Sequence, residues 1–275
     1  MIPSARCLRI VFCLFALLSS VAGALTVERQ TVELTPWKHN EKEFILLVLS
    51  DLHAAETDGA LMDEVVKKGL AEKPDAVALL GDYRYGIDPA HTMPPAELAR
   101  RLAPLAKDKR PVLYILGNHD QGGYAAELEK AFLSAGFSPL DGKTRRLRLD
   151  RNRSMELCGV SFIFGAGKDQ VLAKLPKKTA AGVPLIVLAH SPYVFLKNAF
   201  PSVELVLAGH THGGQLCKPD GTPLRAREKL TPAMQRGGWH TMPSGKKLYI
   251  TRGIGFSQVP MRLCCPPEIT IMTFR

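Results

Sequence analysis

The sequence has few cysteines and aromatic residues, and it lacks several patterns that would point directly to a protein class. Six cysteines and 7% aromatic residues occur in 275 residues. The cysteines lack the paired spacing of structural zinc sites, and no lipobox cysteine follows the apolar N-terminal run. Internal repeats, low-complexity tracts and nucleic-acid-binding motifs are also absent from the sequence. These absences argue against a zinc-binding module, a repeat protein and a lipoprotein, and they make a nucleic-acid partner unexpected.

No uncharged apolar run reaches the roughly 20 residues that a membrane-spanning helix needs. Two arginines precede an apolar run at residues 10–18, and small residues follow at 22–24, as is typical of a secretory signal peptide. A retained membrane anchor is the alternative. We therefore expect residues 1–24 to lie outside the folded body, residues 25–275. The body would then be exported to the periplasm or the extracytoplasmic face of the cell envelope, or remain cytosolic behind an anchor.

Acidic residues are outnumbered by basic ones, 26 to 36, which gives a formal net charge of +10. A basic surface suits nucleic acid, an anionic membrane or a phosphorylated substrate, and charge alone does not distinguish them. With 46% hydrophobic residues the chain can bury one sizeable core, and we expect one α/β domain. We interpret the cysteines after residue 24 as small buried residues, with a disulfide possible only if the body is exported: Cys158, Cys217, Cys264 and Cys265.

Five short apolar runs rich in Val, Ile and Leu end abruptly in glycine or polar residues, which predicts buried strands. They cover residues 44–49, 76–80, 112–116, 185–189 and 203–208. Helical patterns at residues 59–72 and 95–106 lie between strands and indicate parallel β-α-β units. Further strands are predicted at residues 156–164, 247–251 and 269–274. The basic, glycine- and proline-rich residues 218–246 show no periodicity and are predicted to form a long surface loop or cap.

Polar residues directly follow each of the five strands: Asp51 and His53, Asp82, Asn118 with His119 and Asp120, His190, and His210 with His212. Groups at the carboxyl ends of strands in an open α/β sheet converge in one crevice, so we expect these side chains to meet. Taken singly, each has an ordinary alternative as a helix cap or a surface histidine. Together they form a carboxylate, imidazole and amide set that suits Mn²⁺, Fe, Zn²⁺ or Mg²⁺. The set is large enough for two divalent metal ions.

The ordered series D-x-H, G-D, G-N-H-D, H and G-H-x-H resembles the signature of the calcineurin-like metallophosphoesterase superfamily, from about Phe44 to the C-terminus. The resemblance implies an α/β fold with one catalytic domain, a four-layer α/β/β/α sandwich of two sheets flanked by helices. It also implies a dinuclear metal-dependent hydrolase that acts on ester or anhydride bonds of phosphate.

The same resemblance implies a role for each of the polar residues. The implied ligands are Asp51, His53 and His212 for one metal ion, Asn118, His190 and His210 for the other, and Asp82 as the bridge. His119 would stabilise the transferring phosphoryl group or protonate the leaving oxygen, with Asp120 orienting it. The resemblance implies no particular residue as a substrate contact.

A narrower resemblance lies in residues 213–215 and in the tail, residues 251–255 and 266–269. These are similar to the membrane-associated bacterial subgroup of YkuE/YaeI type, which includes phosphodiesterases and hydrolases of UDP-2,3-diacylglucosamine, a lipid A precursor. The resemblance implies a phosphodiester or pyrophosphate substrate, a lipid-linked substrate as one form of it, and a membrane surface as partner. Residues 218–246 do not match, which leaves the substrate open. Export also conflicts with a nucleotide-linked lipid, which is expected on the cytosolic face.

Two alternative functions follow from the sequence. One is a phosphomonoesterase or a nuclease of the same fold: the ligand set is common to hydrolases of monoesters, diesters and pyrophosphates, and the nuclease rests on the positive charge. The other is an inactive scaffold that uses the same surface to bind a partner. Every expected ligand and His119 are present, which favours a hydrolase over a scaffold.

Overall fold

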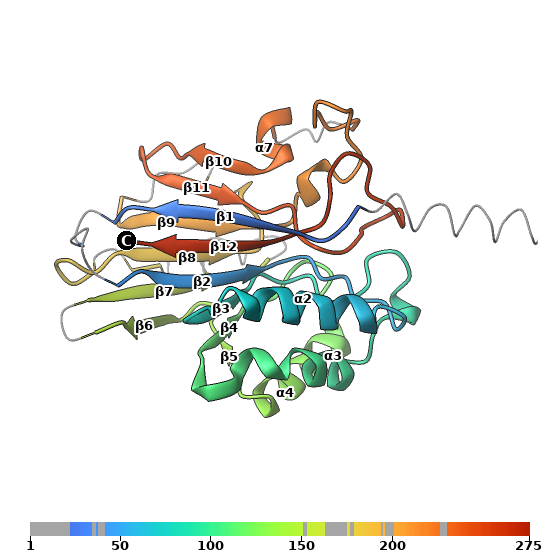
Figure 1. The fold of residues 1–275 in the computed structure, drawn as a ribbon, viewed down its shortest axis with the longest axis horizontal. Coiled ribbons are helices and arrows are strands. Elements are labelled where there is room, and N and C mark those ends of the chain that lie inside the picture. The colour runs from blue at the N-terminus through green and yellow to red at the C-terminus, as the bar shows by residue number, and fades with distance from the viewer. Residues whose placement is uncertain are drawn as a thin grey trace, which may run out of the picture.

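The computed structural model describes residues 23–34, 37, 42–150, 153–162, 175–176, 179–193, 195, 201–225 and 230–275. These residues form two β-sheets that pack face to face, with helices on the outer face of the first (Figure 1). The strand order is β1-β12-β2-β3-β4-β5 in the first sheet and β10-β11-β9-β8-β7-β6 in the second. The expected α/β sandwich of two sheets and helices is confirmed.

The first sheet and its helices come mainly from the first half of the chain. Its elements are β1 (Thr26–Val32), β2 (Phe44–Leu49), α2 (Gly59–Ala71), β3 (Ala76–Leu79), η1 (Pro89–His91), α3 (Pro95–Leu102), η2 (Ala103–Lys109), β4 (Val112–Tyr114), α4 (Gly122–Ser134), β5 (Ser138–Pro139) and the C-terminal β12 (Glu268–Phe274). Strands β2 to β5 are parallel, and β12 runs antiparallel between β2 and its parallel partner β1.

The second sheet comes from the second half of the chain. Its elements are β6 (Thr144–Arg148), β7 (Ser154–Val160), β8 (Leu185–Ala189), β9 (Val203–Ala208), η3 (His212–Gly214), α7 (Pro232–Arg236), β10 (Gly238–Thr241) and β11 (Lys247–Ile250). Strands β7, β8, β9 and β11 are parallel, and the edge strands β6 and β10 are antiparallel to their neighbours.

Three hydrophobic clusters hold these layers together. Alternate side chains of β2 belong to different clusters. Leu47 and Leu49 face helices α2 to α4, while Leu46 and Val48 face the second sheet. The central β-strands are therefore buried on both faces, which explains their nearly continuous apolar sequences. On the outer face of the second sheet, the described residues Phe195 and Met242 cover the apolar side chains of β8, β9 and β11.

The strand predictions hold to within a few residues, with differences that have local causes. The helix predicted at residues 95–106 ends at Leu102, and the chain continues as the 3₁₀ turn η2, because Pro104 has no N–H to donate to the preceding turn. The strand predicted at residues 156–164 is β7, which ends at Val160; residues 163 and 164 lie outside the described residues.

The loop prediction for residues 218–246 is wrong at two places. Residues 232–236 form helix α7, which Thr231 caps by accepting a hydrogen bond from the Met234 N–H. Residues 238–241 form β10, paired with β11. Because both stretches are short, they leave little periodicity to read. Residues 226–229 lie outside the described residues. Among the helices that the structure describes, none has the length and apolar character to cross a bilayer.

Candidate metal centre

The polar residues that follow the five strands converge where the two sheets meet. Within the first sheet, the Asp51 N–H donates to the Gly81 carbonyl over 2.9 Å, which ties the end of β2 to the end of β3. Across the sheets, the ring of His190 bonds through Nδ1 to the Leu80 carbonyl (2.8 Å), and the His210 N–H donates to Asp51 Oδ2 (3.0 Å). These contacts therefore place the residues that follow β8 and β9 against those at the ends of β2 and β3.

Five of these residues adopt left-handed backbone conformations that side-chain-bearing residues seldom take. Their φ angles are +53° at Asp51, +40° at His53, +58° at Asp82, +71° at His210 and +52° at His212. Each such residue costs on the order of 1 kcal/mol or more, so the rest of the fold must enforce these angles. Strain concentrated at one place is typical of a functional site.

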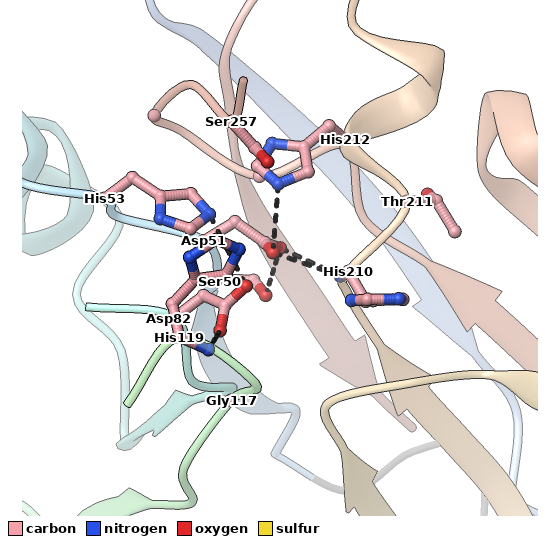
Figure 2. A network of polar contacts seen from close by, with 12 residues as sticks. Ser50, Asp51, His53, Asp82, Gly117, His119, His210, Thr211, His212 and Ser257 are labelled. Atoms are coloured by element: carbon pink, nitrogen blue, oxygen red, sulfur yellow. Dashed lines mark hydrogen bonds and ion pairs between the residues drawn. The ribbon is translucent and has the colours of Figure 1, made fainter. Parts of the chain in front are cut away.

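Two overlapping clusters of side chains have geometry that can hold a metal ion. The first contains Asp51, His53, Asp82 and His212, and the second contains Asp82, His190 and His210. In each cluster the donor atoms lie within 4.8 Å of one another. Figure 2 shows His53, His119 and His212 close to Asp51 and His210 on its other side, with dashed contacts from Asp51 to His210 and His212.

Asp82 is the residue that the two clusters share. Its Oδ2 lies 3.4 Å from His53 Nε2 and 3.3 Å from His190 Nε2, so one oxygen faces both clusters. Its Oδ1 accepts a hydrogen bond from the His119 N–H over 2.8 Å. Asn118 joins the second cluster, because its Oδ1 lies 3.0 Å from the same His190 nitrogen.

The buried acidic and histidine side chains of this cluster shift one another's pKa values. Burial alone would raise the pKa of Asp82, but His190 and His53 hold it well below its usual range. Burial likewise opposes the charged form of His190, yet Asp82 and Asp51 raise the pKa of His190 to about 9. The carboxylates thus keep a positive charge favourable in a place from which water is largely excluded. A cation in this position would meet the same favourable charge.

One orphaned atom tests whether the residues fit a metal ion. His53 is fully buried, its Nδ1 lies 2.7 Å from the Arg84 carbonyl, and its Nε2 makes no well-formed hydrogen bond, since Asp82 Oδ2 stays 3.4 Å away. A buried ring nitrogen without a partner is costly unless something else binds it. The arrangement is that of a metal-binding histidine whose outer nitrogen is fixed by a carbonyl. The residues present therefore fit a metal ion.

His119 and Asp120 belong to neither of the two clusters, and they make different contacts. The His119 ring packs edge-on against His53, with centroids 4.8 Å apart, and burial lowers its pKa. The carboxylate of Asp120 accepts hydrogen bonds from the backbone N–H groups of Gly117, Asp82, Tyr83 and Arg84 over 2.7 to 3.1 Å. Those bonds hold the turn after β3 to the turn after β4. Among the hydrogen bonds of the described residues, none joins Asp120 to the His119 ring.

Sequence reasoning missed two residues that support the clusters. Ser50 donates through Oγ to Asp51 Oδ2 over 2.6 Å. Arg262 is the largest fully buried side chain of the described residues, and it donates to the carbonyls of His212 (3.1 Å), Gly255 (2.9 Å) and Arg252 (2.9 Å). Arg262 thereby ties the turn that carries His212 to the C-terminal loop. Ser50 directly precedes the D-x-H motif, a signal that was available, whereas nothing local marks Arg262.

A family model of calcineurin-like phosphoesterases matches residues 44–214, and the chain belongs to this family. It is 31% identical over 212 residues to the uncharacterized metallophosphoesterase YkuE of Bacillus subtilis (strain 168), covering 74% of this chain and 68% of that protein. It is 30% identical over 244 residues to phosphodiesterase YaeI of Escherichia coli (strain K12), covering 86% and 84%. A transmembrane protein with metallophosphoesterase domain from Danio rerio is 29% identical over 253 residues, covering 82% and 52%.

These relationships confirm the resemblance to the YkuE/YaeI type and the class of the enzyme. The chain is a phosphate ester hydrolase with an Asp and His cluster able to bind a metal ion.

Proposed function

We propose that this chain hydrolyses a phosphodiester or pyrophosphate bond with two divalent metal ions that share Asp82. The observation that carries the proposal is the position of Asp82 Oδ2, which faces His53 in one cluster and His190 in the other. Asp51, His53 and His212 would hold one ion, and Asn118, His190 and His210 the other. When bound, such a pair of cations polarises phosphoryl oxygens and lowers the pKa of a bound water, which makes the attacking group available near neutral pH.

His119 is the proposed hydrogen-bond or proton donor to the substrate. Its ring stands beside His53 without belonging to either metal cluster, and it is only partly buried, so a substrate can reach it. Because burial lowers its pKa, the ring is neutral near pH 7 and offers one N–H to a phosphoryl or leaving oxygen. Asp120 contributes indirectly, by holding the turns that carry Asp82 and Asn118.

We further propose a lipid-linked substrate, of which UDP-2,3-diacylglucosamine is the example to test. Three exposed apolar side chains, which we call the apolar rim, lie in the loops around η3: Leu224 (55% exposed), Val259 (38%) and Leu263 (37%). The loops are joined directly, since the Leu224 N–H donates to the Leu216 carbonyl and Leu216 bridges Leu263. Exposed apolar groups beside basic Arg225 suit an anionic headgroup with an attached acyl chain.

The N-terminal segment meets the fold at the same end. Gly23 lies against Pro266, and the Thr26 N–H donates to the Pro267 carbonyl over 2.8 Å, close in sequence to Leu263. Residues 1–22 lie outside the described residues. We propose that they direct the chain to the cell envelope, either as a signal peptide for export or as an anchor, so that the apolar rim faces a membrane surface.

The function is tested with two substrates side by side. Purified enzyme is assayed on bis-p-nitrophenyl phosphate and on UDP-2,3-diacylglucosamine in the presence of Mn²⁺. Both assays are repeated after chelation of the metal, and again after Mn²⁺ is added back. We expect chelation to abolish both activities and Mn²⁺ to restore them. Persistent inactivity on both substrates with every divalent metal tried would contradict the proposed hydrolysis and favour the scaffold.

The apolar rim is tested with a double variant. Leu224→Ser with Leu263→Ser should raise KM for the lipid-linked substrate by roughly 10-fold or more, since each leucine contributes about 1 kcal/mol of apolar contact. KM for bis-p-nitrophenyl phosphate should stay unchanged. Leu133→Ser is the matched control, because Leu133 is 56% exposed on α4 and outside the apolar rim. Equal effects on both substrates would exclude acyl-chain recognition.

Residues 218–246 remain the candidate cap over the centre. Helix α7 packs against η3, which supports a position near His212. Neutralising Arg225, Arg227 and Lys229 together should raise KM for a lipid-linked substrate and leave a small diester unaffected. Identical kinetics on both substrates would favour a solvated loop without a role in selection.

A further inference from the structure

Two buried thiols meet behind the turn that carries His212. Cys217 is 2% exposed and Cys265 is 3% exposed. The Sγ of Cys217 donates to the Gly213 carbonyl over 3.3 Å, and the Sγ of Cys265 reaches the same oxygen over 3.5 Å. Cys265 also donates to the His212 carbonyl over 3.2 Å. The two sulfurs therefore gather around one backbone oxygen next to a residue of the first metal cluster.

The backbones that carry these thiols run side by side. Leu216 and Leu263 form a parallel bridge, and the Cys217 N–H donates to the Leu263 carbonyl over 2.9 Å. The bridge register places Cys217 opposite Cys264 and one residue before Cys265, and the contacts of both sulfurs with the Gly213 carbonyl bring the Cys217 and Cys265 side chains together, as a disulfide requires. Burial raises the pKa of the Cys217 thiol, and the neighbouring Cys265 raises it further, to about 12.

The proposed hydrolysis uses neither thiol. In the part of the chain that the structure describes, the clusters able to hold a metal ion contain no cysteine. Both sulfurs instead pack against the glycines after His212: a Cβ on Gly213 would lie 2.6 Å from Cys265 Sγ, and one on Gly214 would lie 3.3 Å from Cys217 Sγ. A bond between the sulfurs would therefore act directly on this turn.

We propose that Cys217 and Cys265 form a disulfide in an oxidising environment, which fastens the His212 turn to the C-terminal loop. With glutathione disulfide as oxidant, the two protein thiols become one protein disulfide and two glutathione molecules are released, so atoms and electrons balance. Because the Cys217 thiol is buried and protonated, it reacts slowly in the folded protein. The disulfide is therefore expected to form during folding, or after long equilibration of the folded protein. The inference is independent of the proposed function.

Cys264 offers the competing connectivity. It directly precedes Cys265 and lies opposite Cys217 in the register of the bridge, but it is exposed, whereas Cys217 and Cys265 are buried. A bond from Cys217 to Cys264, or between Cys264 and Cys265, would contradict the proposal. Cys158 lies in β7 with the cluster on the outer face of the second sheet, and it serves as an internal control that stays reduced.

The test maps the bond directly in the full chain. Protein purified under reducing conditions is equilibrated with glutathione disulfide until the thiol count is constant, alkylated, digested with trypsin and analysed by mass spectrometry. We expect a link between the tryptic peptides that contain Cys217 and Cys265. Because Cys264 shares a tryptic peptide with Cys265, the link must persist in Cys264→Ser and vanish in Cys265→Ser.

A second measurement keeps the outcome clear if a variant folds poorly. The oxidised wild type and Cys264→Ser should melt roughly 5 °C or more above their reduced forms, because the bond closes a long loop. Cys217→Ser should show no such shift. A free thiol at Cys217 after full equilibration of the wild type, or a link that is lost in Cys264→Ser, overturns the proposal.

Discussion

Gly117 lies so close to Asp82 that a single methyl group should disable the shared ligand. A Cβ at this position would lie 2.1 Å from Asp82 Oδ1 and 2.4 Å from the Asp82 backbone nitrogen. Gly117 is not among the residues with positive φ, so alanine can adopt its backbone conformation and the effect of Gly117→Ala is purely steric.

The size of the effect follows from the distance. Carbon and oxygen atoms that are not bonded require a separation of more than about 3 Å, so Asp82 must move by roughly 1 Å. A displacement of this size at a reacting centre costs roughly 10²-fold in rate. Overpacking should also lower the free energy of unfolding by about 1 to 3 kcal/mol, which leaves the protein folded.

The assay compares Gly117→Ala with Gly123→Ala. A Cβ on Gly123 meets no atom within 4 Å, and the residue lies at the start of α4. We expect kcat on bis-p-nitrophenyl phosphate to fall about 10²-fold in Gly117→Ala and to stay unchanged in the control. A Gly117→Ala enzyme with normal metal content and turnover would refute the reasoning that Asp82 must stay within reach of both clusters.

Three further variants test other parts of the account. His119→Ala should keep its metal ions, measured by elemental analysis, while turnover falls roughly 10²- to 10⁴-fold; metal loss in proportion to activity would make His119 a ligand. Arg262→Met should lower the melting temperature by more than Arg145→Met, because it removes the donor from buried carbonyls at a cost of about 1 to 3 kcal/mol; equal melting temperatures would contradict this. A hydrogen bond from Arg100 holds the pKa of Glu97 at about 2, so Glu97→Gln should lower the melting temperature at pH 7, with the difference vanishing as pH falls from 4.5 toward 2.

Those parts of the fold that depend on local pattern were predictable from the sequence. Strands such as β8 and β9 are unbroken apolar runs, and the glycine or polar residue at each end marks the place where the chain leaves the sheet. The convergence of Asp51, Asp82 and His190 followed from the rule that strand ends meet in one crevice. Their roles as ligands stay predictions until metal content is measured.

Contacts between residues far apart in the sequence were not predictable in this way. Arg262 lies fifty positions after His212 and has the sequence character of an ordinary surface arginine, yet it is fully buried against the His212 carbonyl. The bonds of Asp120 to the backbone after β3 depend on how two turns pack, which no local pattern records. Strand β10 was missed because four residues at a sheet edge carry too little periodicity.

Metal stoichiometry tests the central claim most directly, because two ions that share Asp82 must respond differently to different substitutions. We expect two divalent ions per chain in the wild type and one in both His212→Ala and His210→Ala, which belong to different clusters. Asp82→Asn should lose both ions, since it weakens both clusters at once. Two ions retained in Asp82→Asn, or a single ion in the wild type at saturating metal, would contradict the account.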